Sequence, residues 1–360
     1  MNFLNMNFSN GTLCEEYKAD LSLQNYLLPI FYSVIFLMGL MGNITVIYII
    51  FFKPGMTTVP NLLIANLSLG DIVFIFGHMC FSIPSYLLPG FYGGNFLCRL
   101  MVFVKCSCLG ISIFTLTFMA VDRFRAITRP LHQQALSRVA VITVMVTIWI
   151  FSMAASVPTI MYTEIKVHPI SNNDTCFILR FCSSEHPYFE VITWVRFCVY
   201  FVIPFFVISF CYIAISTTLC KTQNVSLLVV TNHMDNKTLA IPRRQMEARR
   251  KLSVVVLALV VIFVVCRLPY ESHSIFLLLQ SESIQWWSAA ATVLLYFYSS
   301  INPLILGILS PTFRRFMLKM WCRCFFNFSN TVQTHSAPPN STKIVYNRTN
   351  RSPSPCELLM

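Results

Sequence analysis

Four ionisable side chains lie inside segments that are otherwise strongly apolar. Arg267 and Glu271 occur in the stretch CRLPYESHS, which follows VVVLALVVIFVV and precedes IFLLL. Asp71 and Lys105 occur in two further apolar segments. A charge near the middle of a bilayer costs about 3 kcal/mol, so each of these residues indicates a functional site. The chemistry open to them is ion binding or recognition of a charged group on a ligand.

No pattern typical of catalysis accompanies these charges. The sequence contains no Walker motif, no HExxH motif, no nucleophile elbow and no cysteine and histidine cluster with metal-ligand spacing. We therefore expect no enzyme activity, no bound metal and no cofactor. The net charge of +12 would suit nucleic acid, but the basic residues are spread over separate polar segments. No nucleic-acid partner is expected.

The composition indicates a membrane protein. Of the 360 residues, 56% are hydrophobic and only 11% are charged, whereas soluble domains carry about 25% charged residues. A helix of about 20 apolar residues spans a bilayer, and seven stretches meet this length. We therefore predict an all-α membrane protein, a bundle of seven transmembrane helices over residues 27–309. The predicted spans are 27–52, 61–88, 99–126, 139–162, 191–219, 252–279 and 286–309.

Lysine and arginine predict the orientation of this bundle. Most of the 26 Lys and Arg residues lie in alternate loops and in the C-terminal segment. Because basic loops stay in the cytoplasm, residues 1–26 are expected outside the cell. After the last span we predict a short amphipathic helix at 310–325 and a disordered cytoplasmic tail at 326–360. Glycosylation sequons on the outer side are at Asn7, Asn10 and Asn173.

Cysteines suggest two kinds of modification. Cys98 opens the third span at its outer end, and the following outer loop contains Cys176 and Cys182. Because this compartment is oxidising, we expect a Cys98–Cys176 bridge, with Cys182 as the alternative partner. Cys14 and Cys182 could then form a second bridge. On the inner side, Cys322 and Cys324 follow the basic stretch SPTFRRFMLKMW and are predicted palmitoylation sites, with unmodified thiols as the alternative.

Each predicted span also carries a polar, proline or aromatic residue of a recognisable set. In chain order, the set resembles the markers of rhodopsin-like (class A) G-protein-coupled receptors: Asn43, Asp71, Ser112, Asp122-Arg123-Phe124, Trp149, Pro204 with Tyr212, Pro269 and Asn302-Pro303. The stretches MTTVPNLLIANLSLGD, GISIFTLT, VYFVIP and RRQMEARRKL are similar to those of the bombesin receptors, of the gastrin-releasing-peptide and neuromedin B type. The resemblance implies a plasma-membrane receptor for a peptide.

The resemblance also assigns roles to the inner half of the bundle. It implies a buried polar core, which in this family often holds a sodium ion, made of Asn43, Asp71, Ser112 and Asn302. It further implies that a heterotrimeric G protein binds the cytoplasmic face when the sixth span swings outward. The residues implied in coupling are Asp122, Arg123, Pro130, Leu131 and Tyr212.

Lys105 indicates the class of ligand. The resemblance places Lys105 in the outer pocket together with Arg267, Tyr270 and Glu271. Amine receptors of this family carry an aspartate at the position of Lys105, and a lysine would repel an ammonium group. We therefore expect a peptide that carries acidic or carbonyl groups. The alternative is that Lys105 forms an internal salt bridge with Glu271.

Two residues depart from the family pattern. Arg267 replaces the tryptophan of the C-W-x-P motif, and Leu306 replaces the tyrosine of the NPxxY motif. These changes support an alternative function: a receptor-fold protein that couples weakly or not at all and acts as a decoy or as a partner of other receptors.

Arg267 itself has two possible partners. We predict that it leans inward and acts as a counter-ion for Asp71 in place of sodium, because a buried guanidinium needs a carboxylate. The alternative is a local pair with Glu271, its neighbour at i,i+4 on the same helix.

Overall fold

The computed structural model describes residues 15–16, 23–83, 91, 93–128, 136–172, 175–184, 188–230, 236–280 and 285–321. Among these, seven helical segments are long and apolar enough to cross a membrane. They run over Pro29–Phe52, Val59–Ser82, Gly94–Thr128, Arg138–Met161, Glu190–Cys220, Met246–Leu277 and Trp287–Leu309. All seven predicted spans are confirmed, and their ends move by a few residues.

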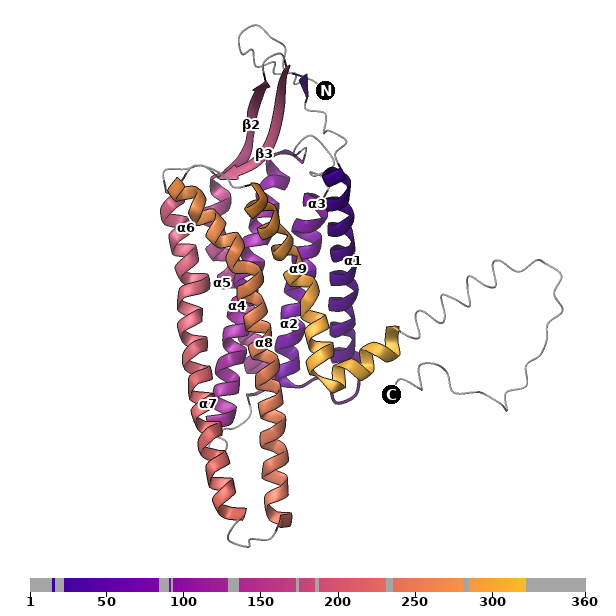
Figure 1. The fold of residues 1–360 in the computed structure, drawn as a ribbon, viewed down its shortest axis with the longest axis vertical. Helices are drawn as coiled ribbons and strands as arrows, with labels where there is room; N and C mark the ends of the chain where they lie inside the picture. Colours follow the sequence, from indigo (N-terminus) through magenta and orange to yellow (C-terminus); the bar gives the residue numbers. More distant parts are fainter. Residues whose placement is uncertain are drawn as a thin grey trace, which may run out of the picture.

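The helices stand side by side as a bundle (Figure 1). The elements are α1 (Leu23–Phe52), α2 (Val59–Phe74) with its continuation η1 (Ile75–Met79) and α3 (Cys80–Ser82), α4 (Gly94–Thr128), α5 (Arg138–Met161), α6 (Phe189–Phe197) with η3 (Cys198–Val202) and α7 (Ile203–Val230), α8 (Asn236–Gln280) and α9 (Gln285–Leu309). A further short helix covers residues 311–321, in agreement with the amphipathic helix predicted after the last span.

Local sequence explains several helix starts and turns. Ser137 caps α5 by accepting a hydrogen bond from the Ala140 N–H at 3.1 Å. The fifth span contains a wide π-type turn, η3, which ends two residues before Pro204. Proline has no N–H to donate to the carbonyl four residues earlier, so the regular helix pattern is broken at this point.

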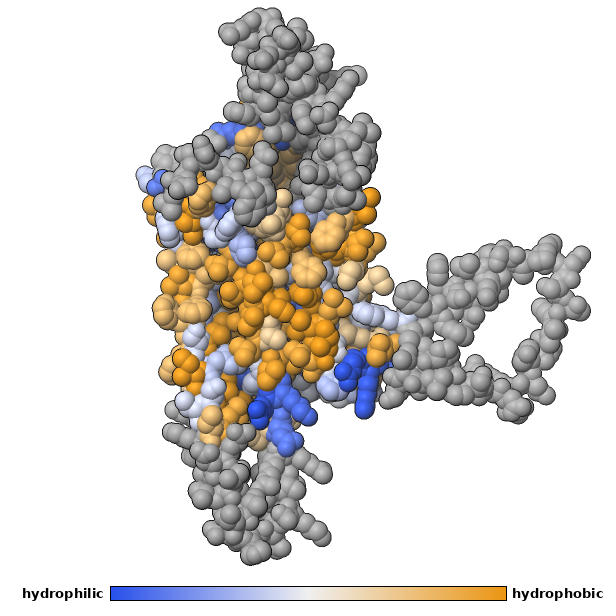
Figure 2. All heavy atoms as spheres, viewed as in Figure 1, coloured by the Kyte–Doolittle hydropathy of each residue, from blue (hydrophilic) through white to orange (hydrophobic). Residues whose placement is uncertain are grey.

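The bundle is apolar on the outside and carries its polar groups inside. Large apolar side chains such as Phe205, Phe206 and Phe210 are exposed. Figure 2 shows a broad apolar band across the middle of the face in view. Asn43, Asp71 and other polar side chains are buried. This arrangement fits a protein whose apolar band faces lipid tails, where polar groups must be satisfied inside the protein.

A β-hairpin projects from one end of the bundle, which we call the hairpin end (Figure 1). Strands β2 (Thr163–Asn172) and β3 (Thr175–Ser184) pair antiparallel, and β1 (Glu15–Glu16) adds to β3 in parallel. Sequence analysis predicted an outer loop here and missed the strands. We call the opposite end, where Arg249, Arg250 and Lys251 lie, the basic end; hydrophilic side chains gather there in Figure 2.

Candidate functional site

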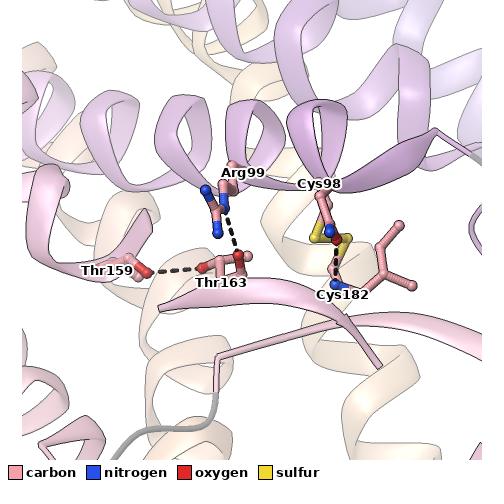
Figure 3. The surroundings of a disulfide bond; sticks show 7 residues. Cys98, Arg99, Thr159, Thr163 and Cys182 are labelled. Carbon is pink, nitrogen blue, oxygen red and sulfur yellow. Dashed lines mark hydrogen bonds between the residues drawn. A yellow bond between two sulfur atoms is a disulfide. The ribbon is translucent and has the colours of Figure 1, made fainter. Parts of the chain in front are cut away.

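A disulfide fastens the hairpin to the start of α4, and its partner differs from the prediction. Cys98 is bonded to Cys182, with the two Cα atoms 5.8 Å apart (Figure 3). The expected Cys98–Cys176 bridge is therefore wrong, and so is a second bridge from Cys14 to Cys182. Cys14 itself lies outside the described residues.

The register of the hairpin explains the choice of Cys182. Thr163 pairs with Ser184 at the base of the hairpin, and its carbonyl accepts a hydrogen bond from Arg99 Nε at 2.9 Å. Cys182 is only two residues from this base, next to Cys98. Cys176 pairs with Ser171 near the far end of the hairpin. The two cysteines are six positions apart along β3, about 20 Å at the usual rise, so only Cys182 is in reach of α4.

Glu271 forms an ion pair that joins two spans. Arg196 of α6 donates from Nη2 to Glu271 Oε2 of α8 at 2.9 Å, and both side chains are largely buried. The expected alternatives, in which Glu271 pairs with Arg267 or with Lys105, are both wrong. Arg196 was missed by sequence analysis, although a lone arginine in an apolar span was a signal of the same kind as Arg267.

Lys105 of α4 also contacts α8, but its partner there is neutral. Its Nζ donates to the Tyr270 hydroxyl at 2.7 Å and lies 4.8 Å from the centre of the Tyr270 ring. No carboxylate pairs with Lys105 within the described part of the chain. A partly buried ammonium is thus held at the hairpin end with hydrogen-bonding capacity left over.

Arg267 is buried deeper than these residues and points into the bundle. Its guanidinium lies between two aromatic rings, 4.9 Å from the centre of Phe74 and 5.0 Å from the centre of Tyr298. Such cation–π contacts stabilise a cation that has left water. Neither ring was predicted to take part, because nothing in the local sequence indicates which side chains of other helices surround Arg267.

The predicted polar core residues do come together. Asn43 of α1 donates to the carbonyl of Ser299 in α9 at 2.7 Å. Asn302 of α9 donates to Asp71 Oδ2 of α2 at 2.8 Å. Ser112 is buried in α4. These contacts tie α9 to α1 and to α2 through buried hydrogen bonds.

At the basic end, two contacts hold α8 against its neighbours. Arg249 Nη1 donates to the Ala126 carbonyl of α4 at 2.6 Å, and the Tyr212 hydroxyl of α7 donates to the Ser253 carbonyl at 2.9 Å. Arg123 forms an ion pair with the adjacent Asp122. Leu306 is packed in the apolar core and offers no hydroxyl.

Several predicted sites lie outside the described residues. They are the glycosylation sites Asn7, Asn10 and Asn173, the coupling residues Pro130 and Leu131, and the palmitoylation sites Cys322 and Cys324. The predicted tail 326–360 also lies there. Within the described ranges, no group of three or more His, Cys, Asp or Glu side chains is arranged to hold a metal ion.

Comparison with known proteins agrees with this architecture. The sheep (Ovis aries) bombesin receptor subtype-3 is 29% identical over 304 residues, covering 81% of this chain and 74% of the relative. The [Phe13]-bombesin receptor of Bombina orientalis is 29% identical over 323 residues, covering 86% of this chain and 80% of the relative. Squid rhodopsin has a similar fold, with a TM-score of 0.70 at 21% identity, covering 84% of this chain and 86% of the rhodopsin chain.

The family model described as "7 transmembrane receptor (rhodopsin family)" matches residues 42–306, which is most of the chain and reaches from within the first span to near the end of the seventh. Members of this family are receptors, so the expectation that the chain is no enzyme is confirmed. The bundle, the buried polar core and the family match lead to one conclusion: this chain belongs to the rhodopsin family of seven-transmembrane G-protein-coupled receptors.

Proposed function

We propose that this receptor binds an extracellular peptide at its hairpin end and activates a heterotrimeric G protein at its basic end. The observation that carries the proposal is that α8 contributes to both ends. Tyr270 and Glu271 contact Lys105 and Arg196 at one end, and Arg249 contacts α4 at the other. These positions are about 30 Å apart along one helix, so a ligand that shifts α8 would act on both. The similarity to bombesin receptors supports a peptide as the ligand.

The charges at the hairpin end favour a ligand with an acidic group. Lys105 and Arg196 are cations in the outer half of the bundle, and among the described residues Glu271 is the only carboxylate in an ion pair with either of them, through Arg196. The remaining positive charge disfavours an amine ligand and favours a carboxylate. In this proposal residues 1–26 and the hairpin are extracellular, and Asn7, Asn10 and Asn173 are glycosylated.

The packing of α8 supports an outward movement of its basic end. A lipid-facing groove of about 870 Å³ separates α7 from α8, and its lining includes Phe205, Ile208, Val261, Val264 and Leu268. At either end of this groove the two spans are joined by Arg196–Glu271 and by Tyr212–Ser253. A helix held at its ends and loosely packed between them can shift between two arrangements.

The proposed G-protein surface lies at the basic end. Once released from its ion pair, Arg123 would face the G protein there, together with Asp122 and Tyr212. Pro130 and Leu131 would insert into the G protein. Palmitoyl groups on Cys322 and Cys324 would hold the helix at 311–321 against the inner leaflet. In this proposal the receptor lies in the plasma membrane with its basic end in the cytoplasm and its N-terminus outside the cell.

A second candidate function is supported by two positions. Arg267 fills the place of the family's tryptophan, and Leu306 leaves α9 without the hydroxyl that could join Tyr212. A receptor with these changes could bind a peptide and couple weakly or not at all, as a decoy or as a partner of other receptors.

One screen separates the two candidates. Cells expressing the receptor are exposed to a neuropeptide library in which each sequence has both a free acid and an amidated C-terminus. Binding and G-protein dissociation are measured together. Binding with dissociation supports the signalling receptor, whereas saturable binding without dissociation supports the decoy. An amine that activates the receptor, with no active peptide, would contradict the proposal.

Lys105→Gln is expected to reduce the potency of an active acid peptide by about 10- to 100-fold, because a hydrogen bond to a charged group is worth roughly 1.5–3 kcal/mol. Concentration–response curves at equal surface expression measure the change. Lys166→Gln is the matched control, since Lys166 is a half-exposed lysine of the hairpin that pairs with Glu164. Unchanged potency in Lys105→Gln would show that the acidic group binds elsewhere.

Arg249→Ala is expected to raise ligand-independent G-protein dissociation by about tenfold, because it removes a charged hydrogen bond that holds α8 against α4. Arg250→Ala is the matched control, because Arg250 is the exposed neighbour of Arg249. Reduced signalling in Arg249→Ala alone would mean that Arg249 contacts the G protein rather than restraining α8.

A further inference from the structure

The Arg267 side chain is enclosed in the protein and incompletely paired. The residue is 2% exposed. Its guanidinium is stacked between Phe74 and Tyr298, but Nε and Nη2 donate to no acceptor among the described residues. A buried charge without hydrogen bonds is costly unless another charge compensates it. Glu271 is already paired with Arg196, so it does not fill this role.

Asp71 lacks hydrogen-bond donors, whereas Arg267 lacks acceptors. The residue is 1% exposed, and its Oδ2 accepts from Asn302 while its Oδ1 accepts no hydrogen bond within the described residues. The hydroxyls of Ser299 and Tyr298 lie beside Asp71 and Asn302 but form no hydrogen bond of standard geometry. The Ser112 hydroxyl and the side-chain oxygen of Asn302 are likewise unpaired. This cluster therefore holds a buried carboxyl group together with spare acceptors.

Arg267 and Asp71 are neighbours through two helices. Phe74, under the guanidinium, is three residues from Asp71 on α2. Tyr298, over the guanidinium, is four residues from Asn302 on α9. Each spacing is about one helical turn, so the two charges are roughly 5–10 Å apart. The positive charge of Arg267 acts on the Asp71 carboxylate at this range.

The residues present do not fit a sodium ion. Receptors that this sequence resembles often hold sodium among the positions of Asn43, Asp71 and Ser112. The oxygen atoms of this cluster would suit a hard cation. The neighbouring Arg267 opposes sodium binding. A fixed positive charge about 10 Å from a bound sodium ion, in a medium of effective dielectric about 20, weakens sodium affinity on the order of tenfold.

We propose that Arg267 is the built-in cation of the Asp71 cluster, so that this receptor neither needs nor binds sodium there. The spare donors of Arg267 complement the spare acceptors around Asp71, and a buried water between them would satisfy both sets. The positive charge that stabilises this arrangement is then part of α8. It does not depend on the salt outside the cell, and the inference does not depend on which ligand the receptor binds.

Thermal unfolding of the purified receptor in sodium chloride and in potassium chloride, at equal ionic strength, tests the inference. The wild type is expected to have the same midpoint in both salts at every concentration. Arg267→Met, which removes the charge and keeps a flexible chain of similar length, is expected to gain a sodium-specific stabilisation that grows with concentration. Asp71→Asn in the Arg267→Met background is expected to abolish this gain.

Two outcomes would overturn the inference. One is a sodium-specific stabilisation of the wild type that Asp71→Asn removes. The other is a folded neutral variant without any sodium response. Arg267→Trp, which restores the family's residue, is measured in parallel so that a folding defect in one variant does not decide the result. Arg267→Lys retains the charge and is expected to remain insensitive to sodium.

Discussion

Replacing Arg196 by methionine is expected to lower the free energy of unfolding by about 3–5 kcal/mol, because Glu271 then stays buried without its cation. The ion pair is short, 2.9 Å, and both partners are largely buried. The pair also joins α6 to α8, so its loss removes a contact between two spans. The midpoint of thermal unfolding of the purified receptor measures the effect.

The double variant Arg196→Met/Glu271→Met is expected to recover most of the lost stability, since an apolar pair can replace a buried ion pair with little cost. Lys166→Met is the control. It breaks the Lys166–Glu164 pair of the hairpin, whose side chains are half-exposed, and exposed pairs contribute about 0–1 kcal/mol. A double variant as unstable as Arg196→Met would mean that Arg196 acts through packing and not through its charge.

Cys182→Ser is expected to reduce surface expression strongly, because loss of a native disulfide costs about 2–5 kcal/mol. Cys98→Ser should have the same effect, and combining the two should add little. Cys198→Ser is the control, because Cys198 is an exposed free cysteine, and it should leave expression near that of the wild type. Disulfide mapping by mass spectrometry should find a peptide linked through Cys98 and Cys182.

A cross-linked peptide containing Cys98 and Cys176 would show that the register of the hairpin differs from the one described here. Equal loss of expression in Cys198→Ser and Cys182→Ser would also argue against the assigned bridge. Ligand binding is then measured on the cysteine variants that still reach the cell surface. It shows whether the ligand can still enter at the hairpin end.

The sequence by itself determined the class of protein and the positions of the spans. Length and hydropathy are local properties, and a bilayer accepts only structures whose backbone groups are all paired within the protein. An apolar stretch of sufficient length therefore has to be a helix. The polar core of Asn43, Asp71 and Asn302 was predicted from the resemblance to rhodopsin-like receptors, and the burial of these side chains agrees with the cost of polar groups on a lipid-facing surface.

Only the tertiary structure decided which charges and cysteines are partners. Arg267 and Glu271 are i,i+4 neighbours, but Arg267 turns inward between Phe74 and Tyr298 while Glu271 turns toward Arg196 on another helix. In the same way Cys182 was selected by the register of a hairpin that no local pattern had indicated. Partner choice depends on how helices rotate and how strands align across segments far apart in sequence, and that packing belongs to the folded molecule as a whole.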